Sequence, residues 1–409
     1  MLKRNVLILS LFCLLLVAAT APLTVRAAEA PAGSTGNRTL QSPVAFAETG
    51  VYAVLSGKLY YHDYASGQSV FLRNVDLVDD VYAGKLNGTP RRFEKYYEMT
   101  DQPGFVQVYD GSLWLLTRRH QANEAGWKYV LRQYDRAASE AVDHVLGDVD
   151  AVSMGALHLN RFFFLVDEAL PIGDNRYTNV GRLWESDLAT GVTRPLDLPV
   201  AMFAFTFHDT FLYFAGYHDD DTERLTDGSK ADRNDFKLYR YDLTDGSLQD
   251  LGQTCYHEHV WWLGDKLLFI RAENGEPGGG DSTYDLHAVD PTTGKSERFL
   301  TLGENGMFSV LATDGERLAL QTMHQPPDLS HVLDNYLYDA AGQELYHSQE
   351  TYAADIDYSA LPELAGFDRG RLYFLKGFYR DSNVDYRELR MLDTHDLATT
   401  PRVLIEWEK

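Results

Sequence analysis

Apolar and polar residues alternate in short runs along most of this chain, and two kinds of run recur. The first is an aromatic-rich segment that follows a turn residue, as in GVYAVL, GSLWLLT, NRFFFLV, TFLYFAG, DKLLFIR, ERLALQT and GRLYFLK. The second ends in an aspartate and a turn, as in LYYHDYASG, LRQYDRAAS, LWESDLATG, LYRYDLTDG, LHAVDPTTG, NYLYDAAGQ and LRMLDTHD. Alternation with many Tyr, Phe, Leu and Val residues predicts β-strands. No sustained helical periodicity is present.

The aspartates of the second run define a repeat of about 55 residues. They are Asp63, Asp135, Asp187, Asp242, Asp290, Asp339 and Asp393, so successive copies are 72, 52, 55, 48, 49 and 54 residues apart. Each unit predicts four antiparallel strands, a to d, with the first run as strand b and the second as strand c. Seven such units predict an all-β fold, a seven-bladed β-propeller. Tandem β-sandwiches, or six or eight blades, are the alternatives.

The repeated aspartate has a structural interpretation. Its carboxylate can accept backbone N–H groups in the c–d turn that follows. We therefore expect turn stabilisation, and not catalysis, from these seven residues.

The repeated runs resemble those of the TolB-like and YWTD-like secreted bacterial propellers. The shared features are the Leu-Tyr pairs, the strand-c aspartate and the turn glycines Gly67, Gly191, Gly246 and Gly294, over residues 44–409. The resemblance implies a propeller. Such proteins mostly bind, scaffold or accompany enzymes, and a minority are lyases or hydrolases.

Residues 1–30 have the pattern of a secretory signal peptide. Lys3 and Arg4 precede an apolar run at 6–19, and Ala28-Glu29-Ala30 fits a cleavage site. An uncleaved anchor is the alternative. Residues 31–43 are expected to be a flexible leader, and 44–409 a single propeller domain with an insertion at 74–104. Residues 38–48 could begin the first blade or add a strand to the last. We expect a secreted or extracytoplasmic protein without a membrane contact after cleavage.

The formal net charge of −23 opposes a nucleic-acid partner, because phosphate binds basic surfaces. The long connections are predicted between strands b and c, on one face: 120–127, 169–181, 217–235, 273–282, 323–332 and 378–385. The 74–104 insertion falls on that face too. Loops gathered on one face of a rigid scaffold favour binding there.

Three groups of residues on this chain are candidates for chemistry or binding. Aromatic rings expected on the b–c loops could stack on a sugar or hold a peptide: Tyr97, Trp127, Tyr177, Tyr217, Phe378 and Tyr379. Asp219, Asp220 and Asp221 could hold Ca²⁺, although the EF-hand pattern is missing. His257 and His259 share a face of an innermost strand and could hold Mn²⁺ or Zn²⁺, with His208 or His324 as a further ligand.

The sequence thus predicts a monomeric, non-catalytic propeller that binds a protein or a glycan through its b–c face. Two alternatives stay open. One is a metal-assisted polysaccharide lyase or hydrolase that uses the channel-facing histidines His257 and His259. The other is a passive structural module of the cell envelope.

Overall fold

The computed structural model divides into two compact units, Met1–Ala32 and Gly33–Lys409. The structure describes residues 43–55, 57–75, 106–120, 127–135, 138, 140–147, 149, 152–171, 177–219, 236–256, 259–274, 283–303, 310–326, 330–356, 360–380, 383–396 and 401–406. The predicted signal peptide, all of the leader except Pro43 and nearly all of the 74–104 insertion lie outside these residues. No helix in the described part of the chain has the length and apolar character that a membrane crossing requires.

The described residues of the second unit form 28 strands in seven antiparallel meanders, which we call blades 1 to 7. Blade 1 contains β1 (Val44–Phe46), β2 (Gly50–Leu55), β3 (Lys58–Asp63) and β4 (Ser69–Asn74), and blade 2 contains β5 (Val106–Tyr109), β6 (Ser112–His120), β7 (Trp127–Tyr134) and β8 (Ala141–Val145). Blade 3 contains β9 (Val152–His158), β10 (Arg161–Pro171), β11 (Tyr177–Asp187) and β12 (Thr193–Pro195), and blade 4 contains β13 (Val200–His208), β14 (Phe211–His218), β15 (Phe236–Asp242) and β16 (Leu248–Cys255). Blade 5 contains β17 (Val260–Leu263), β18 (Lys266–Asn274), β19 (Thr283–Val289) and β20 (Ser296–Gly303), and blade 6 contains β21 (Val310–Thr313), β22 (Arg317–His324), β23 (His331–Asp339) and β24 (Glu344–Tyr352). Blade 7 contains β25 (Glu363–Asp368), β26 (Arg371–Arg380), β27 (Asn383–Asp393) and β28 (Arg402–Glu406).

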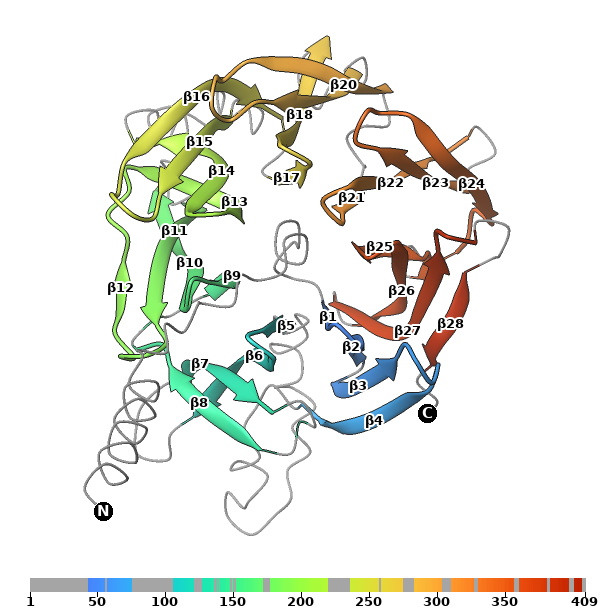
Figure 1. Ribbon diagram of the computed structural model, residues 1–409, viewed down its shortest axis with the longest axis horizontal. Coiled ribbons are helices and arrows are strands. Elements are labelled where there is room, and N and C mark those ends of the chain that lie inside the picture. The colour runs from blue at the N-terminus through green and yellow to red at the C-terminus, as the bar shows by residue number, and fades with distance from the viewer. Residues whose placement is uncertain are drawn as a thin grey trace, which may run out of the picture. The chain divides into compact units, whose positions relative to one another are not determined.

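These blades follow one another around a ring, which confirms the predicted β-propeller. The first strand of each blade lies nearest the centre of the ring, and the fourth lies at its rim (Figure 1). β1 contacts both β5 and β25, so the first and last blades are neighbours. Blades 3 and 4 are joined into one larger sheet by a single pairing between Gly181 and Met202.

The aromatic strand-b runs form the cores between blades. Phe162, Phe163 and Phe164 on β10 are successive residues, so their side chains point to alternate faces of the sheet, and all three are fully buried. A free sheet would leave one of those faces in water. Because neighbouring blades cover both faces, strand b can be apolar on both sides.

The ring closes through side-chain contacts between blades 1 and 7. In the described part of the chain, β1 pairs within blade 1 and no N-terminal strand is added to blade 7. The hydroxyl groups of Tyr64 and Tyr373 lie 2.7 Å apart, and the guanidinium of Arg371 stacks on the Tyr64 ring. The Ser69 hydroxyl donates to the carbonyl oxygen of Leu404 at 2.6 Å. The open question about 38–48 is thereby answered for Val44–Phe46, which begins the first blade.

The structural role predicted for the repeated aspartates is confirmed. In each of the seven copies, Oδ1 accepts a backbone N–H from the turn: Ser66 to Asp63, Glu140 to Asp135, Thr190 to Asp187, Thr244 to Asp242, Thr292 to Asp290, Ala341 to Asp339 and His395 to Asp393. The backbone bonds from Ser66, Thr190 and Thr292 are the largest cause of a lowered pKa at their aspartates.

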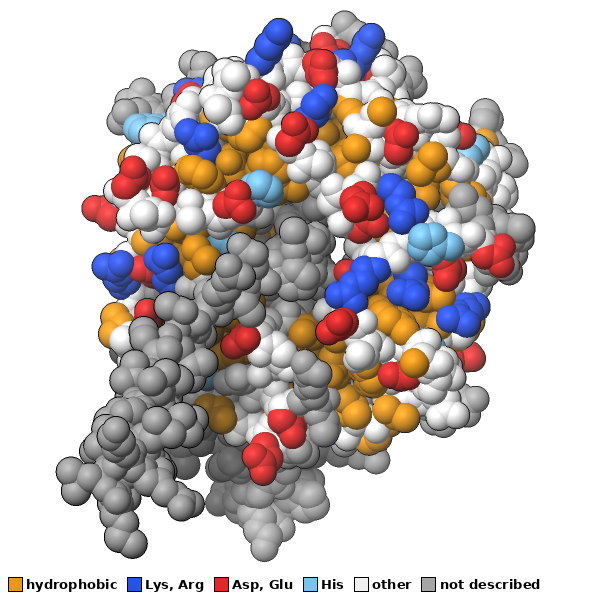
Figure 2. Space-filling view, in the orientation of Figure 1, with side chains coloured by type: hydrophobic (Ala, Val, Ile, Leu, Met, Phe, Trp, Pro, Cys, Tyr) orange, Lys and Arg blue, Asp and Glu red, His pale blue; other side chains and the backbone are white. Residues whose placement is uncertain are grey.

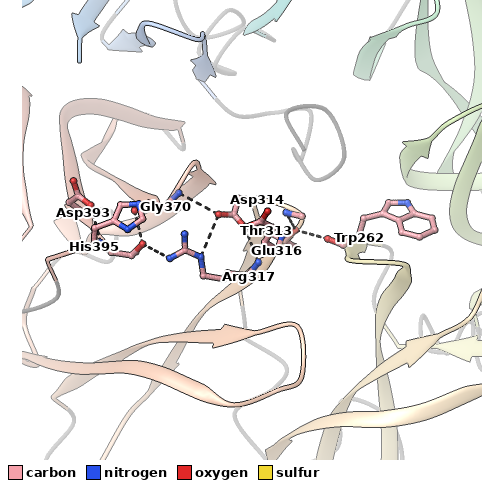
Figure 3. A network of polar contacts seen from close by, with 10 residues as sticks. Trp262, Thr313, Asp314, Glu316, Arg317, Gly370, Asp393 and His395 are labelled. Carbon is pink, nitrogen blue, oxygen red and sulfur yellow. Dashed lines mark hydrogen bonds and ion pairs between the residues drawn. The ribbon is translucent and has the colours of Figure 1, made fainter. Parts of the chain in front are cut away.

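A polar network joins neighbouring blades at the end that carries the a–b and c–d turns. The Thr313 hydroxyl donates to the carbonyl oxygen of Trp262 at 2.5 Å, which links blades 6 and 5. Arg317 Nη1 donates to the Thr394 hydroxyl at 2.9 Å, which links blades 6 and 7 (Figure 3). At this end, the turns are tight and these hydrogen bonds link blades 5, 6 and 7 to one another.

Candidate functional site

The b–c end of the blades carries the longer connections, but two of the predicted loops are largely strand. The a–b turns are short, for example 159–160, 209–210 and 264–265. At the b–c end, β10 and β11 pair out to Leu170 and Pro171, and β26 and β27 pair out to Arg380. The loops predicted at 169–181 and 378–385 are therefore mostly extended hairpins, because the β-favouring residues there continue the ladder beyond the blade.

Charged side chains gather on strand c near this end. The position five residues before the repeated aspartate holds Lys58, Val130, Arg182, Lys237, Asp285, Asp334 and Glu388 in blades 1 to 7. The aspartate itself never changes, whereas this position is basic in blades 1, 3 and 4, uncharged in blade 2 and acidic in blades 5 to 7. Three of these residues form distinct polar clusters with neighbouring strands.

The first cluster crosses from blade 3 to blade 4. Arg182 Nε donates to Glu168 Oε2 at 2.9 Å, and its Nη1 donates to Asp219 Oδ1 at 2.7 Å. Of the three aspartates predicted as a Ca²⁺ site, Asp219 is thus paired with an arginine. Asp220 and Asp221 lie outside the described residues.

The second cluster lies within blade 5, on β18 and β19. His287 Nε2 lies 2.7 Å from Glu273 Oε1, and Asp285 is two residues before His287 on the same face of β19. One ligand atom from each of the three lies within 4.8 Å of the others. Asp285 and His287 are 4% and 8% exposed.

The third cluster lies within blade 6, where Asp334 occupies the position that Asp285 has in blade 5. Asp334 Oδ1 accepts from Gln349 Nε2 at 2.9 Å and lies 2.9 Å from His347 Nε2. His324 Nδ1 lies 3.4 Å from Asp334 Oδ2. The ring of His347 stacks on Tyr336 with 4.4 Å between centroids. This buried carboxylate is therefore surrounded by donors.

The metal site predicted at His257 and His259 stays a prediction, because only His259 of this pair lies within the described residues. His259 comes directly before β17, and its ring lies 6.2 Å from that of Trp261, while His257 is outside the described residues. His208 ends β13 at the a–b turn and stacks on Trp262 at 4.0 Å. His324 ends β22 at the opposite, b–c end, so His208 and His324 cannot be ligands of one ion.

The predicted aromatic residues have backbone positions at the b–c ends of their strands, where the structure describes them. Trp127 and Tyr177 begin β7 and β11, and Phe378 and Tyr379 are among the last three residues of β26. Their side chains, and all of Tyr97, are outside the described residues. Tyr217 is buried, with its ring 4.7 Å from that of Phe236, so this ring packs between strands and is covered.

Sequence reasoning missed Glu273, Asp285 and His287. The signal was available in the D-x-H pair of TYDLHAVD, which strand alternation places on one face. The sequence did not show that Glu273, 14 residues before His287 and on the preceding strand, would face this pair.

The face of the propeller in Figure 2 carries charges of both signs, and Lys and Arg side chains gather over blades 6 and 7 on the right of the view. On the face in view, positive charge is therefore concentrated on one side. An acidic composition alone does not make every surface repel anions.

The comparisons with known proteins give similarities to solved structures. No family model and no curated protein matches the chain. Among solved structures, an oligogalacturonate lyase in complex with manganese shares 12% identity with a TM-score of 0.48, covering 84% of this chain and 87% of that one. An ulvan lyase shares 10% with a TM-score of 0.48, covering 88% and 94%. TolB from Acinetobacter baumannii shares 13% with a TM-score of 0.40, covering 86% and 76%. At the level of the fold, the chain is similar to TolB and to other β-propellers.

Proposed function

We propose that this protein is an extracytoplasmic binding propeller that holds a glycan or a peptide segment at the b–c end of its blades. The observation that carries the proposal is the backbone position of the aromatic residues. Trp127, Tyr177, Phe378 and Tyr379 belong to three strand ends, of β7, β11 and β26, at the same end of the blades. Aromatic rings on a rigid scaffold are suited to stacking on sugars and to contacts with peptides.

The opposite end of the blades supports the same assignment by contrast. There the turns are short, and the repeated aspartates bind the turn backbone in every blade. Carboxylates that accept backbone N–H groups in this way stabilise the fold and are not available to bind a ligand. The variable charges at the b–c end, such as Arg182 and Asp334, give each blade its own chemistry.

A glycan microarray and an immobilised peptide library, each probed with the purified protein, test this proposal. We expect binding that is lost when Trp127, Tyr177, Phe378 and Tyr379 are all changed to alanine. The matched control changes the exposed residues Phe71, Val142, Val192 and Val403 of other surfaces to alanine, and should bind as the parent does. No binding by the parent, or equal binding by the quadruple aromatic variant, would remove the proposal.

A metal-assisted lyase or hydrolase is the second candidate function, favoured by the imidazole and two carboxylates in blade 5. Metal-dependent loss of polymer length would support it, with each polysaccharide of the array incubated with protein and Mn²⁺ or Zn²⁺. Binding of a polysaccharide without its cleavage would support the binding function and exclude the lyase or hydrolase activity on that polysaccharide.

A further inference from the structure

We propose that Glu273, Asp285 and His287 form a site for one divalent transition-metal ion, Zn²⁺ or Mn²⁺, at the b–c end of blade 5. The site is built by adjacent strands. Asp285 and His287 share one face of β19. Glu273 faces them from β18, near the point where both strands meet the b–c connection. The inference concerns blade 5 alone and does not rest on the proposed function.

The spacing of the three side chains suits a metal. Their ligand atoms all lie within 4.8 Å of one another. Two ligands at the usual metal distance of about 2.1 Å can be up to about 4.2 Å apart. Small side-chain rotations can therefore bring all three into contact with one ion, without any change in the β18–β19 ladder.

Asp285 is the strongest argument, because it is a buried carboxylate with little to compensate its charge. It is 4% exposed, and its polar contact is Arg298 Nη1 at 3.5 Å, from an arginine side chain that is 65% exposed. Glu185, a buried carboxylate of blade 3, is better compensated. Glu185 accepts from Arg161 Nη1 at 2.9 Å and from Arg194 Nε at 2.8 Å. A buried charge without good partners is costly, and a cation at this point removes the cost.

His287 supplies an independent observation. Its Nε2 faces Glu273, while Nδ1 is buried and has no hydrogen-bond partner within the described part of the chain. A ring that donates from Nε2 to a carboxylate keeps a lone pair at Nδ1, and carboxylates commonly orient metal-binding histidines in this way. Binding through Nε2 instead would make Glu273 a direct ligand. In the first arrangement Glu273 orients the ring and Asp285 and His287 are the ligands, whereas in the second all three side chains are ligands.

The donor set decides which metal fits. An imidazole nitrogen favours Zn²⁺ and other transition metals, whereas Ca²⁺ takes oxygen ligands. Three protein ligands leave coordination positions for water or for an oxygen of a bound molecule. Arg271 Nε, 3.5 Å from Glu273 Oε1, and Arg298 lie beside the carboxylates and are partly exposed, so both can turn toward solvent when the ion binds.

Calorimetric titration of the EDTA-treated full chain with Zn²⁺, Mn²⁺ and Ca²⁺ tests the site. We expect one saturable site for Zn²⁺, weaker binding of Mn²⁺ and no comparable site for Ca²⁺. Asp285→Asn and His287→Gln should each weaken Zn²⁺ binding about 10-fold or more. Co²⁺ should give a visible absorption band in the parent that both variants lose.

The matched control is Asp334→Asn, which changes the equivalent carboxylate of blade 6 and should leave Zn²⁺ affinity within about twofold. Glu273→Gln is the further variant, because its side chain is partly exposed and the change should not disturb folding, which circular dichroism in EDTA checks. The proposal is overturned by three results: no saturable Zn²⁺ or Mn²⁺ binding, equal binding by Asp285→Asn and the parent, or binding that His257→Ala abolishes.

Discussion

At the turn end of the blades, Asp290 of blade 5 and Asp339 of blade 6 have the same role, since each accepts two backbone N–H groups. Five residues earlier on the same strands, Asp285 and Asp334 are also equivalent by position, but their surroundings differ. Asp334 is held by His347 and Gln349 at 2.9 Å, whereas Asp285 has, among the residues that the structure describes, the 3.5 Å contact with Arg298 alone.

The difference separates two uses of the same residue type on one scaffold. A repeated role marks what every blade needs in order to fold. A position that is equivalent in each blade but has different partners, as at Asp285 and Asp334, is not required for folding in the same way. The turn end of blades 5 and 6 is therefore structural, and the b–c end is where blades acquire individual chemistry.

The largest expected effect is at Asp334. Changing it to leucine removes the acceptor for His347 and Gln349, and we expect a loss of about 2–3 kcal/mol in the free energy of unfolding. Urea unfolding at pH 7 in EDTA measures it. Asp334→Asn keeps one acceptor oxygen and should cost less. A loss below about 1 kcal/mol for the leucine variant would mean that Asp334 is no better compensated than Asp285.

A smaller effect is expected at the turn end. Asp339→Ala removes the bonds from Ala341 N at 2.9 Å and Gln343 N at 2.8 Å, and should cost about 1 kcal/mol because the turn is partly exposed. Asp339→Asn retains an acceptor and is the control. If both variants unfold at the parent's urea midpoint, the repeated aspartate contributes nothing to stability, and the structural interpretation of the turn end fails.

Acid should weaken the turn end through the same carboxylates. The pKa values of Asp63, Asp187 and Asp290 are lowered in the folded protein, chiefly by backbone N–H bonds. A lowered folded pKa means that the stabilisation is present above the unfolded pKa of about 3.9 and is lost as the pH falls through the lower folded value.

Thermal melting from pH 5 to pH 2 in EDTA measures this acid effect. The midpoint should fall in the parent, and it should fall less steeply in the variant that changes all three aspartates to asparagine. Identical slopes for the two proteins would contradict it.

The repeated part of this molecule was predictable from sequence, and the individual part was not. The strand-b and strand-c runs predicted the propeller, and the aspartate before each turn predicted the bonds found at Asp63 and the six other copies. These features depend on neighbours in sequence. The turn glycines follow the same logic, since Gly67, Gly191, Gly246 and Gly294 all have φ near +70°, where other residues are strained.

The blade 5 site depends on neighbours in space. Whether Glu273 faces His287 depends on the register between β18 and β19, which includes a shift between Ala272 and Asn274. An irregularity of one residue exchanges the two faces of a strand, and alternation alone does not reveal it.

The smallest expected effect completes the comparison of blades 5 and 6. Asp285→Leu in EDTA should change the free energy of unfolding by less than about 1 kcal/mol, because Arg298 is already mostly in solvent and loses little. The same substitution at Asp334 costs more, because donors there are left unpaired. Adding Zn²⁺ should stabilise the parent and leave the Asp285→Leu variant where it was, since an ion bound only by the folded state raises stability with its concentration. If Asp285→Leu in EDTA costs as much as Asp334→Leu, Asp285 is compensated by the fold itself, and the reason for placing a cation beside it disappears.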